Sequence, residues 1–263
     1  MKKASARTII LNCDLPEFFG IFSPRHVKII VVEHSPKPFG TRKRLGLVIR
    51  TALTMRGCHW VSVSEHLNIW PYNQKSTVIK NAISDIESRS CGIKPNSPIK
   101  RLAFVGRLAN PQKRPEFLFY AAREADLEVV FIGTGKELKN LKKSAESLKV
   151  KTTFSGYIEN PFLDFDKGDL LVIPSIWEGD GLVVLEAMKL GVPLLLSDIP
   201  DFRRFNLKEK HYFKDEGDLA RIVMDCKNIS EFVVSKDDTD RILQERDVKS
   251  IARKWLDYIA QIK

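Results

Sequence analysis

The sequence predicts an α/β fold built on parallel sheets. Short runs rich in Val, Ile and Leu recur along the chain, and stretches with the spacing of amphipathic helices lie between them. Most of the short runs are apolar throughout instead of alternating, which is typical of strands covered on both faces. Strands that alternate with helices form parallel neighbours joined by right-handed crossovers. We therefore expect parallel sheets with helices on both sides.

The expected strands are short, apolar and bounded by turn residues. They are TIIL (8–11), VKIIVVE (27–33), WVSVS (60–64), STVIK (76–80), RLAFVG (101–106), LEVVFIG (127–133), KTTFSG (151–156), DLLVIPS (169–175) and VPLLLSD (192–198). Helices are expected at 41–56, 114–125, 135–148, 181–190, 216–228 and 248–262.

One stretch divides the chain. SRSCGIKPNSP (88–98) is rich in Ser, Gly and Pro, as linkers are. We expect an N-terminal lobe over 1–97, a second domain over 98–235 and a C-terminal helical segment over 236–263. Because no strand follows the last helix, we expect that segment to pack back on the N-terminal lobe.

Composition describes a globular chain. Of its 263 residues 43% are hydrophobic, enough to fill one or two cores. The four cysteines (Cys13, Cys58, Cys91 and Cys226) have the spacing neither of a zinc site nor of a disulfide framework. The apolar run near the start is too short for a signal peptide, and no run reaches a membrane-spanning length. We expect a cytoplasmic protein.

The net charge of +10 is concentrated in the N-terminal part. Residues 1–60 hold eleven Lys or Arg against three Asp or Glu, so +8 of that charge lies there. Such a surface suits an anionic membrane, nucleic acid or a phosphorylated substrate, or it is a solvated face that keeps the protein soluble. Neither a recognition motif nor interleaved aromatic residues accompany the charge, so we expect no nucleic-acid partner.

Two strand-to-helix turns carry residues suited to phosphate, which binds beyond the carboxyl ends of parallel strands. In FVGRLANPQKRPEF, Arg107 and Lys113 follow a strand. Arginine can donate two hydrogen bonds to a phosphate, and lysine adds a point charge. In VVFIGTGKEL the paired glycines let backbone approach a ligand, or they form a tight turn. Leu138 occupies the third glycine position of the dinucleotide fingerprint, which disfavours a nicotinamide cofactor.

A third turn, PSIWEGDGLVVLEAMKLGVP (174–193), places Glu178 and Glu186 eight residues apart. In one continuous helix they would lie about 80° and about 12 Å apart and would not converge. If the helix begins near Gly181, Glu178 lies in a loop, Glu186 lies in the second turn, and both can face a ligand over the helix start. The alternative is that Glu186 pairs with Lys189 on a solvated face.

Four segments, in this order and spacing, resemble one known family. FVGRLANPQKRPEFL, VVFIGTGKELKNL, TTFSGYIEN and DLLVIPSIWEGDGLVVLEAMKLGVPLLLSDIP are similar to the nucleotide-sugar-binding half of retaining glycosyltransferases of family 4, the glycosyl transferases group 1. The resemblance implies a GT-B type α/β fold with a complete C-terminal Rossmann-like domain. VKIIVVEHSPKP, CHWVSVSEHL and STVIKNAISD match only later strands of the other lobe, which implies a shortened, partial N-terminal α/β lobe.

The resemblance also implies roles for matching residues. Arg107 and Lys113 would bind the donor diphosphate, Glu178 the hydroxyls of the donor sugar and Glu186 the ribose. The other expected site residues are His34 beside the sugar, Gly106, Gly133, Tyr157 and Ile158 around the nucleotide, and the backbone of Asp180, Gly181 and Leu182 at the phosphate.

The implied activity is transfer of a hexose, with retention, from a nucleotide-sugar donor, expected to be a UDP-sugar. The acceptor would be a surface polysaccharide, lipopolysaccharide or glycolipid, and no cofactor or metal is expected. Asp164 and Asp166 form a D-x-D pattern that holds a divalent metal in another glycosyltransferase fold, but they precede the strand at 169–173 and lie away from its carboxyl end. The alternative is a truncated, non-catalytic nucleotide-sugar-binding remnant or subunit.

The basic helix at 41–57 intersperses Arg and Lys with Leu, Ile and Val. This composition suits a lipid-linked acceptor at an anionic membrane surface, and it suits equally a core helix with a charged outer face. On the first interpretation the protein is peripheral at the inner face of the cell membrane.

Overall fold

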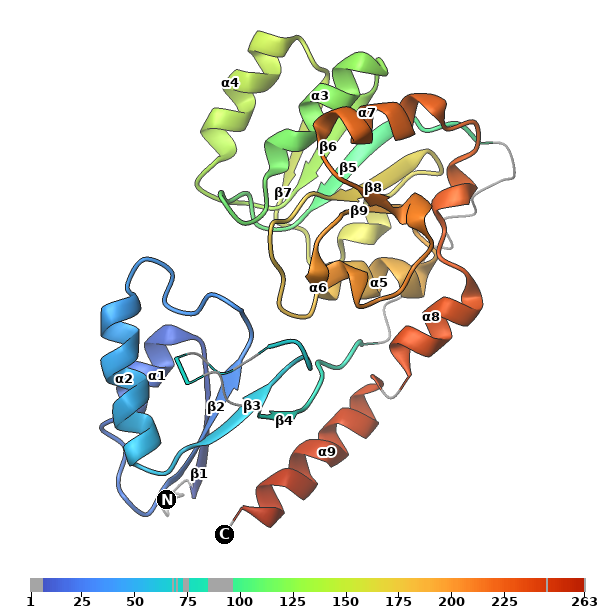
Figure 1. Cartoon of the computed structure of the whole chain (residues 1–263). Coiled ribbons are helices and arrows are strands. Elements are labelled where there is room, and N and C mark those ends of the chain that lie inside the picture. Colours follow the sequence, from blue (N-terminus) through green and yellow to red (C-terminus); the bar gives the residue numbers. More distant parts are fainter. Residues whose placement is uncertain are drawn as a thin grey trace, which may run out of the picture. The chain divides into compact units, whose positions relative to one another are not determined.

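The computed structural model describes residues 7–67, 69, 71–72, 76–84, 97–244 and 246–262 (Figure 1). It divides the chain into two compact units. The first comprises Met1–Ala82, Glu178–Asp180 and Glu245–Lys263, and the second comprises Ile83–Trp177 and Gly181–Gln244. The linker expected at 88–98 lies mostly outside the described residues. Each unit contains a parallel sheet, which confirms the predicted α/β class.

In the second unit the described strands form a six-stranded parallel sheet in the order β10-β9-β8-β5-β6-β7. The chain moves outward from β5 to β7, then returns to β8 beside β5 and moves outward on the other side. In doubly wound sheets, ligands bind at the carboxyl end of such a reversal. The strands are β5 (Arg101–Val105), β6 (Glu128–Ile132), β7 (Thr152–Gly156), β8 (Asp169–Ile173), β9 (Leu194–Ser197) and β10 (Tyr212–Phe213).

Helices cover both faces of this sheet, and strand side chains alternate between two apolar clusters (Figure 1). Phe104 and Phe131 pack with α3, α4 and α7, whereas Val105 and Ile132 belong to the cluster that contains α5 and α6. Both faces are therefore dry, which explains why the strands are apolar throughout. The helices are α3 (Leu118–Glu124), α4 (Leu138–Leu148), α5 (Leu182–Leu190), α6 (Pro200–Arg203), α7 (Glu216–Asp225) and α8 (Lys236–Leu243).

In the first unit the described strands form a four-stranded parallel sheet in the order β1-β2-β3-β4. Two helices, α1 and α2, lie over one face, where Leu11, Val31 and Leu53 are buried. Helix α9 lies over the other face, where Ile251 packs with Ile30 (Figure 1). The elements are β1 (Thr8–Asn12), α1 (Asp14–Gly20), β2 (Lys28–Glu33), α2 (Lys43–Met55), β3 (His59–Ser62), β4 (Thr77–Val78) and α9 (Val248–Gln261).

The segment expected over 236–263 is divided between the units. Helix α8 packs Ile242 and Leu243 against an apolar cluster of the second unit, whereas α9 belongs to the first. Side chains of Ser235 and Asp247 cap the starts of α8 and α9 by accepting backbone N–H bonds. In the part of the chain that the structure describes, no helix combines the length and apolar character needed to cross a bilayer.

A buried ion cluster joins α1, α2 and β2. Arg50 is 1% exposed and donates to both carboxylate oxygens of Glu17 (2.9 and 2.7 Å) and to Glu33 (2.5 Å). Burial raises the pKa of both glutamates, and the Arg50 charge opposes that shift. Because two buried carboxylates share one cation, the cluster depends strongly on Arg50.

The loops after β5 and β6 pass each other at very short range. A Cβ on Gly133 would lie 1.9 Å from the carbonyl oxygen of Gly106, and a Cβ on Gly135 would lie 2.1 Å from that of Leu108. The backbone N–H of Leu108 also donates to Thr134 (2.9 Å). The paired glycines of this turn are therefore required first for contact between two loops of the protein itself.

We expect Arg50→Met to lower the free energy of unfolding by about 3–5 kcal/mol at pH 7, because two buried carboxylates lose their cation. The loss should shrink at pH 5. In the folded state the pKa values of Glu17 and Glu33 are raised above the ordinary 4.5, so the folded protein binds more protons than the unfolded one. The free energy of unfolding therefore falls as pH rises through these pKa values. Urea unfolding at both pH values measures this. Arg44→Met, at an exposed position of α2, is the control, and equal losses in the two variants would contradict the expectation.

We expect Gly133→Ala to destabilise the second unit by more than Gly191→Ala. Both glycines have positive φ (147° and 66°), so each alanine bears backbone strain of about 1–2 kcal/mol. Only the Gly133 Cβ meets another atom; nothing lies within 4 Å of a Cβ at Gly191. Overpacking should add about 1–3 kcal/mol at Gly133. Urea unfolding compares the two variants, and equal destabilisation would show that the loops can separate freely.

Candidate functional site

A pocket of about 370 Å³ opens at the carboxyl ends of β5, β6 and β7. It combines backbone of glycine-containing loops with one exposed cation and apolar side chains. Its lining residues are Val105, Gly106, Arg107, Ile132, Gly133, Thr134, Tyr157, Ile158 and Pro161. Five residues singled out from the sequence thus lie together: Gly106, Arg107, Gly133, Tyr157 and Ile158.

Backbone conformation shapes this pocket. Gly106 and Gly133 both adopt φ near 145° (145° and 147°), a region that side chains disfavour. Two strand ends therefore present bare main chain at the pocket. Tyr157 is 77% exposed, so the face of its ring is accessible to a flat ligand.

Hydrogen bonds fix the loop that carries Arg107. Arg107 Nη2 donates to Gln112 Oε1 (3.1 Å), and Gln112 Nε2 donates to the carbonyl of Trp177 (3.2 Å). Arg114 Nε donates to the carbonyl of Pro174 (2.7 Å). The loop after β5 is thus tied to the loop after its neighbour β8. Sequence reasoning missed these roles of Gln112 and Arg114, because both depend on contacts across about 60 residues.

Lys113 lies in the same loop and is half-buried. It directly precedes Arg114, whose backbone is left-handed (φ 45°). Lys113 and Arg107 therefore belong to one anchored loop at the carboxyl end of β5, and two cations at such a position suit an anionic ligand.

Helix α5 begins as the sequence suggested. Gly181 is its N-cap residue with φ 67°, no side chain caps this end, and no acidic residue lies in its first turn. Leu182 is the first helical residue. The backbone N–H groups and the positive end of the helix dipole are thus not offset by a carboxylate of the helix start, which favours an anion there.

Glu186 lies in the second turn of α5. Its side chain is half-buried, and burial raises its pKa. Among the described residues it has no hydrogen-bond or ion-pair partner. Lys189, the expected alternative partner, donates to the backbone carbonyl of Ser84 (3.0 Å). A half-buried carboxylate without a protein partner can accept hydrogen bonds from a ligand.

Asp180 belongs to the first unit, and its carboxylate is held from two sides. Arg246 donates to both oxygens (2.8 and 2.9 Å), and Asn81 Nδ2 donates to one of them (2.9 Å). Asp180 and Arg246 are both nearly inaccessible to solvent. The side chain of Asp180 thus has a structural task, and its expected role at the phosphate concerns only the backbone N–H. Sequence reasoning missed Arg246, which stands in no motif.

His34 and the tripeptide Glu178–Asp180 lie together in the first unit. A Cβ on Gly179 would lie 1.9 Å from the carbonyl oxygen of His34. The His34 ring is half-buried, its Nε2 lies 3.0 Å from Asn12 Oδ1, and burial lowers its pKa while the charge of Asp180 opposes this shift. His66 Nε2 donates to the carbonyl of Glu178 (3.3 Å). Glu178 itself is buried.

The expected site residues thus fall into two groups, one in each unit. The first unit carries His34, Glu178 and Asp180. The second carries Gly106, Arg107, Lys113, Gly133, Tyr157, Ile158, Gly181, Leu182 and Glu186.

The D-x-D pattern lies before β8, at the amino end of this strand. Asp166 pairs with Arg101 (3.0 Å), and the side chain of Asp164 is outside the described part of the chain. Among the described residues, no group of three or more His, Cys, Asp or Glu is arranged to hold a metal ion.

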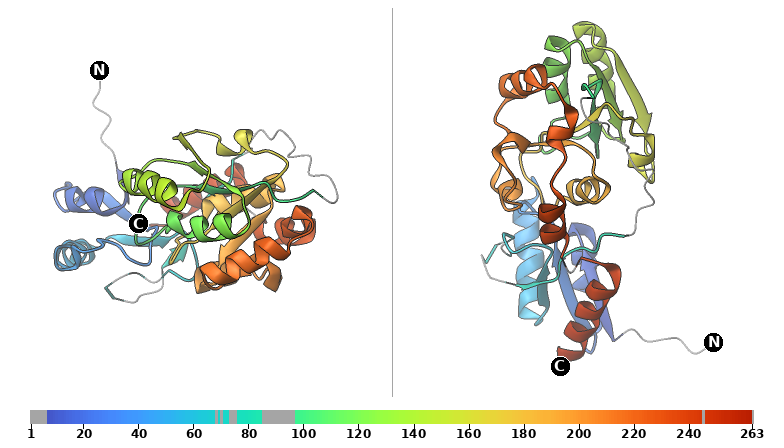
Figure 2. Two further views of the ribbon diagram at one scale, coloured as in Figure 1. Left: turned by 90° about the horizontal axis from the view of Figure 1, so that it is seen from above. Right: turned by 90° about the vertical axis from the view of Figure 1, so that its right-hand side faces the viewer.

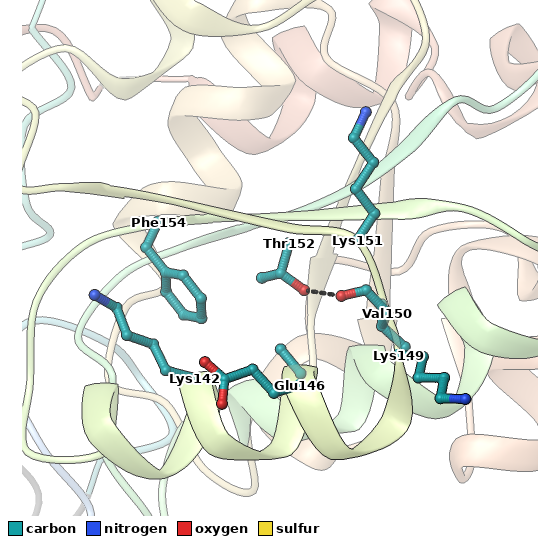
Figure 3. Close-up of a pocket in the computed structure, with 8 residues that line it drawn as sticks. Lys142, Glu146, Lys149, Val150, Lys151, Thr152 and Phe154 are labelled. Atoms are coloured by element: carbon teal, nitrogen blue, oxygen red, sulfur yellow. Dashed lines mark hydrogen bonds between the residues drawn. The ribbon is translucent and has the colours of Figure 1, made fainter.

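A second hollow, of about 500 Å³, lies between α4 and β7 (Figure 3). This hollow is lined by Lys142 and Glu146 of α4, by Lys149 at the C-terminal end of the helix and by Phe154 of β7. It contains none of the residues that the sequence singled out.

Comparison with known proteins shows which family and which solved structures this chain is similar to. The family model described as "Glycosyl transferases group 1" matches residues 92–233. The UDP-Gal:alpha-D-GlcNAc-diphosphoundecaprenol alpha-1,3-galactosyltransferase of Escherichia coli is 31% identical over 125 residues, covering 44% of this chain and 32% of that protein. The O-antigen biosynthesis glycosyltransferase WclY of Escherichia coli is 29% identical over 137 residues, covering 49% and 39%. The chain thus spans about a third of the length of these relatives.

Among solved structures, a TarM mutant of S. aureus in complex with Fondaparinux, alpha-GlcNAc-glycerol and UDP superimposes with a TM-score of 0.71. The match covers 94% of this chain and 54% of that one, at 19% identity. Together with the two parallel-sheet units, this likeness confirms the predicted GT-B type fold. Because the family model covers more than half of the 263 residues, the chain belongs to the glycosyl transferases group 1 family.

Proposed function

We propose that this chain acts in transfer of a sugar, with retention, from a UDP-sugar to a surface polysaccharide, lipopolysaccharide or glycolipid. The observation that carries the proposal is the pocket at the carboxyl ends of β5, β6 and β7, where Gly106, Arg107, Gly133, Tyr157 and Ile158 meet. Its bare backbone and apolar side chains suit a nucleoside, and the neighbouring cations suit a diphosphate.

The donor would lie along the carboxyl edge of the second sheet. Its nucleoside would contact Tyr157 and Ile158, its diphosphate Arg107 and Lys113, and its ribose Glu186. The uncapped start of α5 would add backbone N–H groups for the phosphate. A uridine diphosphate is favoured because UDP-Gal is the donor in the name of one relative and UDP is bound in the TarM structure.

The acceptor class follows from the relatives as well. One relative acts on a diphosphoundecaprenol-linked sugar, and another takes part in O-antigen biosynthesis. We therefore propose a lipid-linked or surface glycan as the acceptor, which this protein would meet peripherally at the inner face of the cell membrane.

The proposed chemistry depends on charge and position. The bond between the anomeric carbon and the diphosphate oxygen breaks, and the acceptor hydroxyl attacks from the same face. Its proton passes to the departing phosphate, so no side chain has to act as base. Arg107 and Lys113 would offset the charge that develops on the diphosphate, and no metal is required. In the first unit, Glu178 would accept hydrogen bonds from the sugar hydroxyls and His34 would line the sugar.

A second candidate is a nucleotide-sugar-binding subunit or remnant without catalysis. The pocket at the carboxyl ends of β5, β6 and β7 lies wholly in the second unit and would serve binding without catalysis equally well. The two candidates share the donor pocket and differ only in turnover.

The test begins with binding. Calorimetry of the purified chain with UDP, ADP, GDP and NAD should show selective binding of UDP, and absence of binding would contradict both candidates. Incubation with UDP-sugars and lipid-linked glycan acceptors then separates them. Release of UDP with formation of an α-linked product from an α-linked donor supports retaining transfer, whereas binding without product supports the non-catalytic subunit.

We expect Glu186→Gln to weaken UDP binding about ten- to hundredfold at pH 8, because a ribose hydroxyl loses a charged acceptor worth about 1.5–3 kcal/mol. Burial raises the pKa of Glu186, so the carboxyl takes up a proton at a higher pH than an ordinary glutamate does. UDP affinity of the unaltered chain should therefore fall as pH falls through this pKa, and that of the variant should not. Calorimetry from pH 5 to pH 8 measures both. Identical pH profiles would remove Glu186 from the site.

Glu178→Gln is the matched comparison. If Glu178 contacts the sugar, this variant binds UDP with unchanged affinity and binds the UDP-sugar more weakly. An equal loss for both ligands would contradict the sugar role.

A further inference from the structure

Helix α1 turns its apolar side away from the core. Leu15, Phe18 and Phe19 of α1 and Phe22, two residues after its end, follow the spacing i, i+3, i+4, i+7 and are all exposed, Phe22 by 71%. The face toward the sheet instead buries Glu17 and Gly20. An ordinary surface helix has the opposite arrangement, with its apolar stripe inward.

The exposed aromatic rings of α1 form a cluster. The Phe18 ring packs edge-to-face against Phe19 (5.4 Å between centroids) and against Phe22 (5.5 Å). Phe18 thus contacts both other rings, and three neighbouring exposed rings present more apolar surface in one place than scattered single exposures do.

Helix α2 carries a second apolar stripe besides the one in the core. Gly46, Ile49 and Leu53 face the sheet, whereas Leu45, Val48 and Met55 are exposed, Met55 by 85%. Helices α1 and α2 contact each other and lie side by side (Figure 2, left). We call Leu15, Phe18, Phe19, Phe22, Leu45, Val48 and Met55 the α1–α2 surface.

The two helices and their connections also carry exposed cations and few exposed carboxylates. Arg25, Arg42, Lys43 and Arg44 are exposed on the same two-helix layer and its connections. Of the three acidic residues in 1–60, Glu17 and Glu33 are buried against Arg50. Only Asp14 remains outside, and its carboxylate accepts the backbone N–H of Phe39 (3.1 Å). The layer therefore presents apolar and positive groups together.

This combination selects among possible occupants. A second copy of the chain would bring two sets of cations together, and like charges oppose such contact. An anionic bilayer satisfies both components, since headgroups neutralise Arg and Lys while aromatic and aliphatic side chains enter the acyl boundary. We propose that the α1–α2 surface docks on an anionic phospholipid membrane. This inference deepens the proposed function, which places the acceptor at the membrane, and vesicle binding tests it without requiring sugar transfer.

The test uses the full chain and sedimentation with vesicles. Binding to vesicles of phosphatidylcholine with 30 mol% phosphatidylglycerol is compared with binding to phosphatidylcholine alone, at low and at high salt. We expect binding to the anionic vesicles, weakened by salt. Absence of binding to both kinds of vesicle overturns the proposal.

The apolar part is tested with Phe19→Ser combined with Phe22→Ser. Both side chains are exposed, so the fold should tolerate the change, and thermal unfolding checks this. Partition into anionic vesicles should fall about tenfold or more, because two aromatic side chains no longer leave water. Met224→Ser combined with Leu256→Ser removes two exposed apolar side chains elsewhere (53% and 68% exposed) and should leave partition unchanged. Equal effects of the two pairs overturn the proposal.

The charged part is tested with Arg42→Gln, Lys43→Gln and Arg44→Gln together. At about 1 kcal/mol per cation near an anionic surface, partition should fall about 100-fold at low salt. The control changes Lys139, Lys142 and Lys143 of α4 to Gln; these three lysines are exposed, on a helix whose apolar residues Leu141 and Ala145 are buried. This control lowers the net charge by the same three units. If both triple variants lose the same amount of vesicle binding, binding depends only on net charge and the proposal is overturned.

A second copy is tested by analytical ultracentrifugation. If the chain is a dimer that the two Phe→Ser changes dissociate, and it does not bind vesicles, the α1–α2 surface is a self-interface and the membrane proposal is wrong.

Discussion

The first-unit part of the candidate site depends on the buried carboxylate of Asp180. An isolated carboxylate at this depth would cost several kcal/mol. Arg246, 66 residues later, and Asn81, 99 residues earlier, offset that cost with direct hydrogen bonds. The same tripeptide is then fixed through its backbone, by His66 at Glu178 and by the close approach of Gly179 to His34. Three separated segments thereby set where the Glu178 backbone lies. The ion pair of Asp180 with Arg246, which belongs to no motif, thus helps to position Glu178, which does belong to one.

In the second unit, glycine has the corresponding function. The pocket lies where three parallel strands end, and the loops after β5 and β6 can pass each other only because Gly133 and Gly135 lack side chains. A glycine required for contact between loops also leaves bare backbone at the surface of the pocket. The two interpretations of the paired glycines, tight packing and ligand approach, are therefore not exclusive: the first produces the geometry that the second uses.

Sequence reasoning succeeded where local pattern and topology determine structure. The strands were recognisable because both sheet faces are buried. Gly106, Arg107 and Gly133 were found at the ends of parallel strands, and Tyr157 and Ile158 were found from the family resemblance. It failed for α1, because a helix of seven residues that contains Pro16 is too short for its apolar spacing to distinguish it from a loop. It also missed Arg50 as a core residue. In a helix with so many cations, nothing local distinguishes the one that neutralises Glu17 and Glu33 from those facing water. For α2 one apolar stripe enters the core, as the core-helix interpretation predicts, and the membrane interpretation stays a prediction.

The buried cluster and the positive surface are linked. Arg50 neutralises only part of the charge of Glu17 and Glu33, so the cluster has a formal charge of −1 when both are ionised, and the remainder of residues 1–60 carries +9. The interior thus holds two of the three acidic side chains that could have balanced the outer face. At physiological ionic strength charges are screened over about 8 Å. The exposed cations of α1, α2 and their connections therefore attract chiefly a partner in direct contact with them. That partner must also accept the exposed apolar side chains of the two helices.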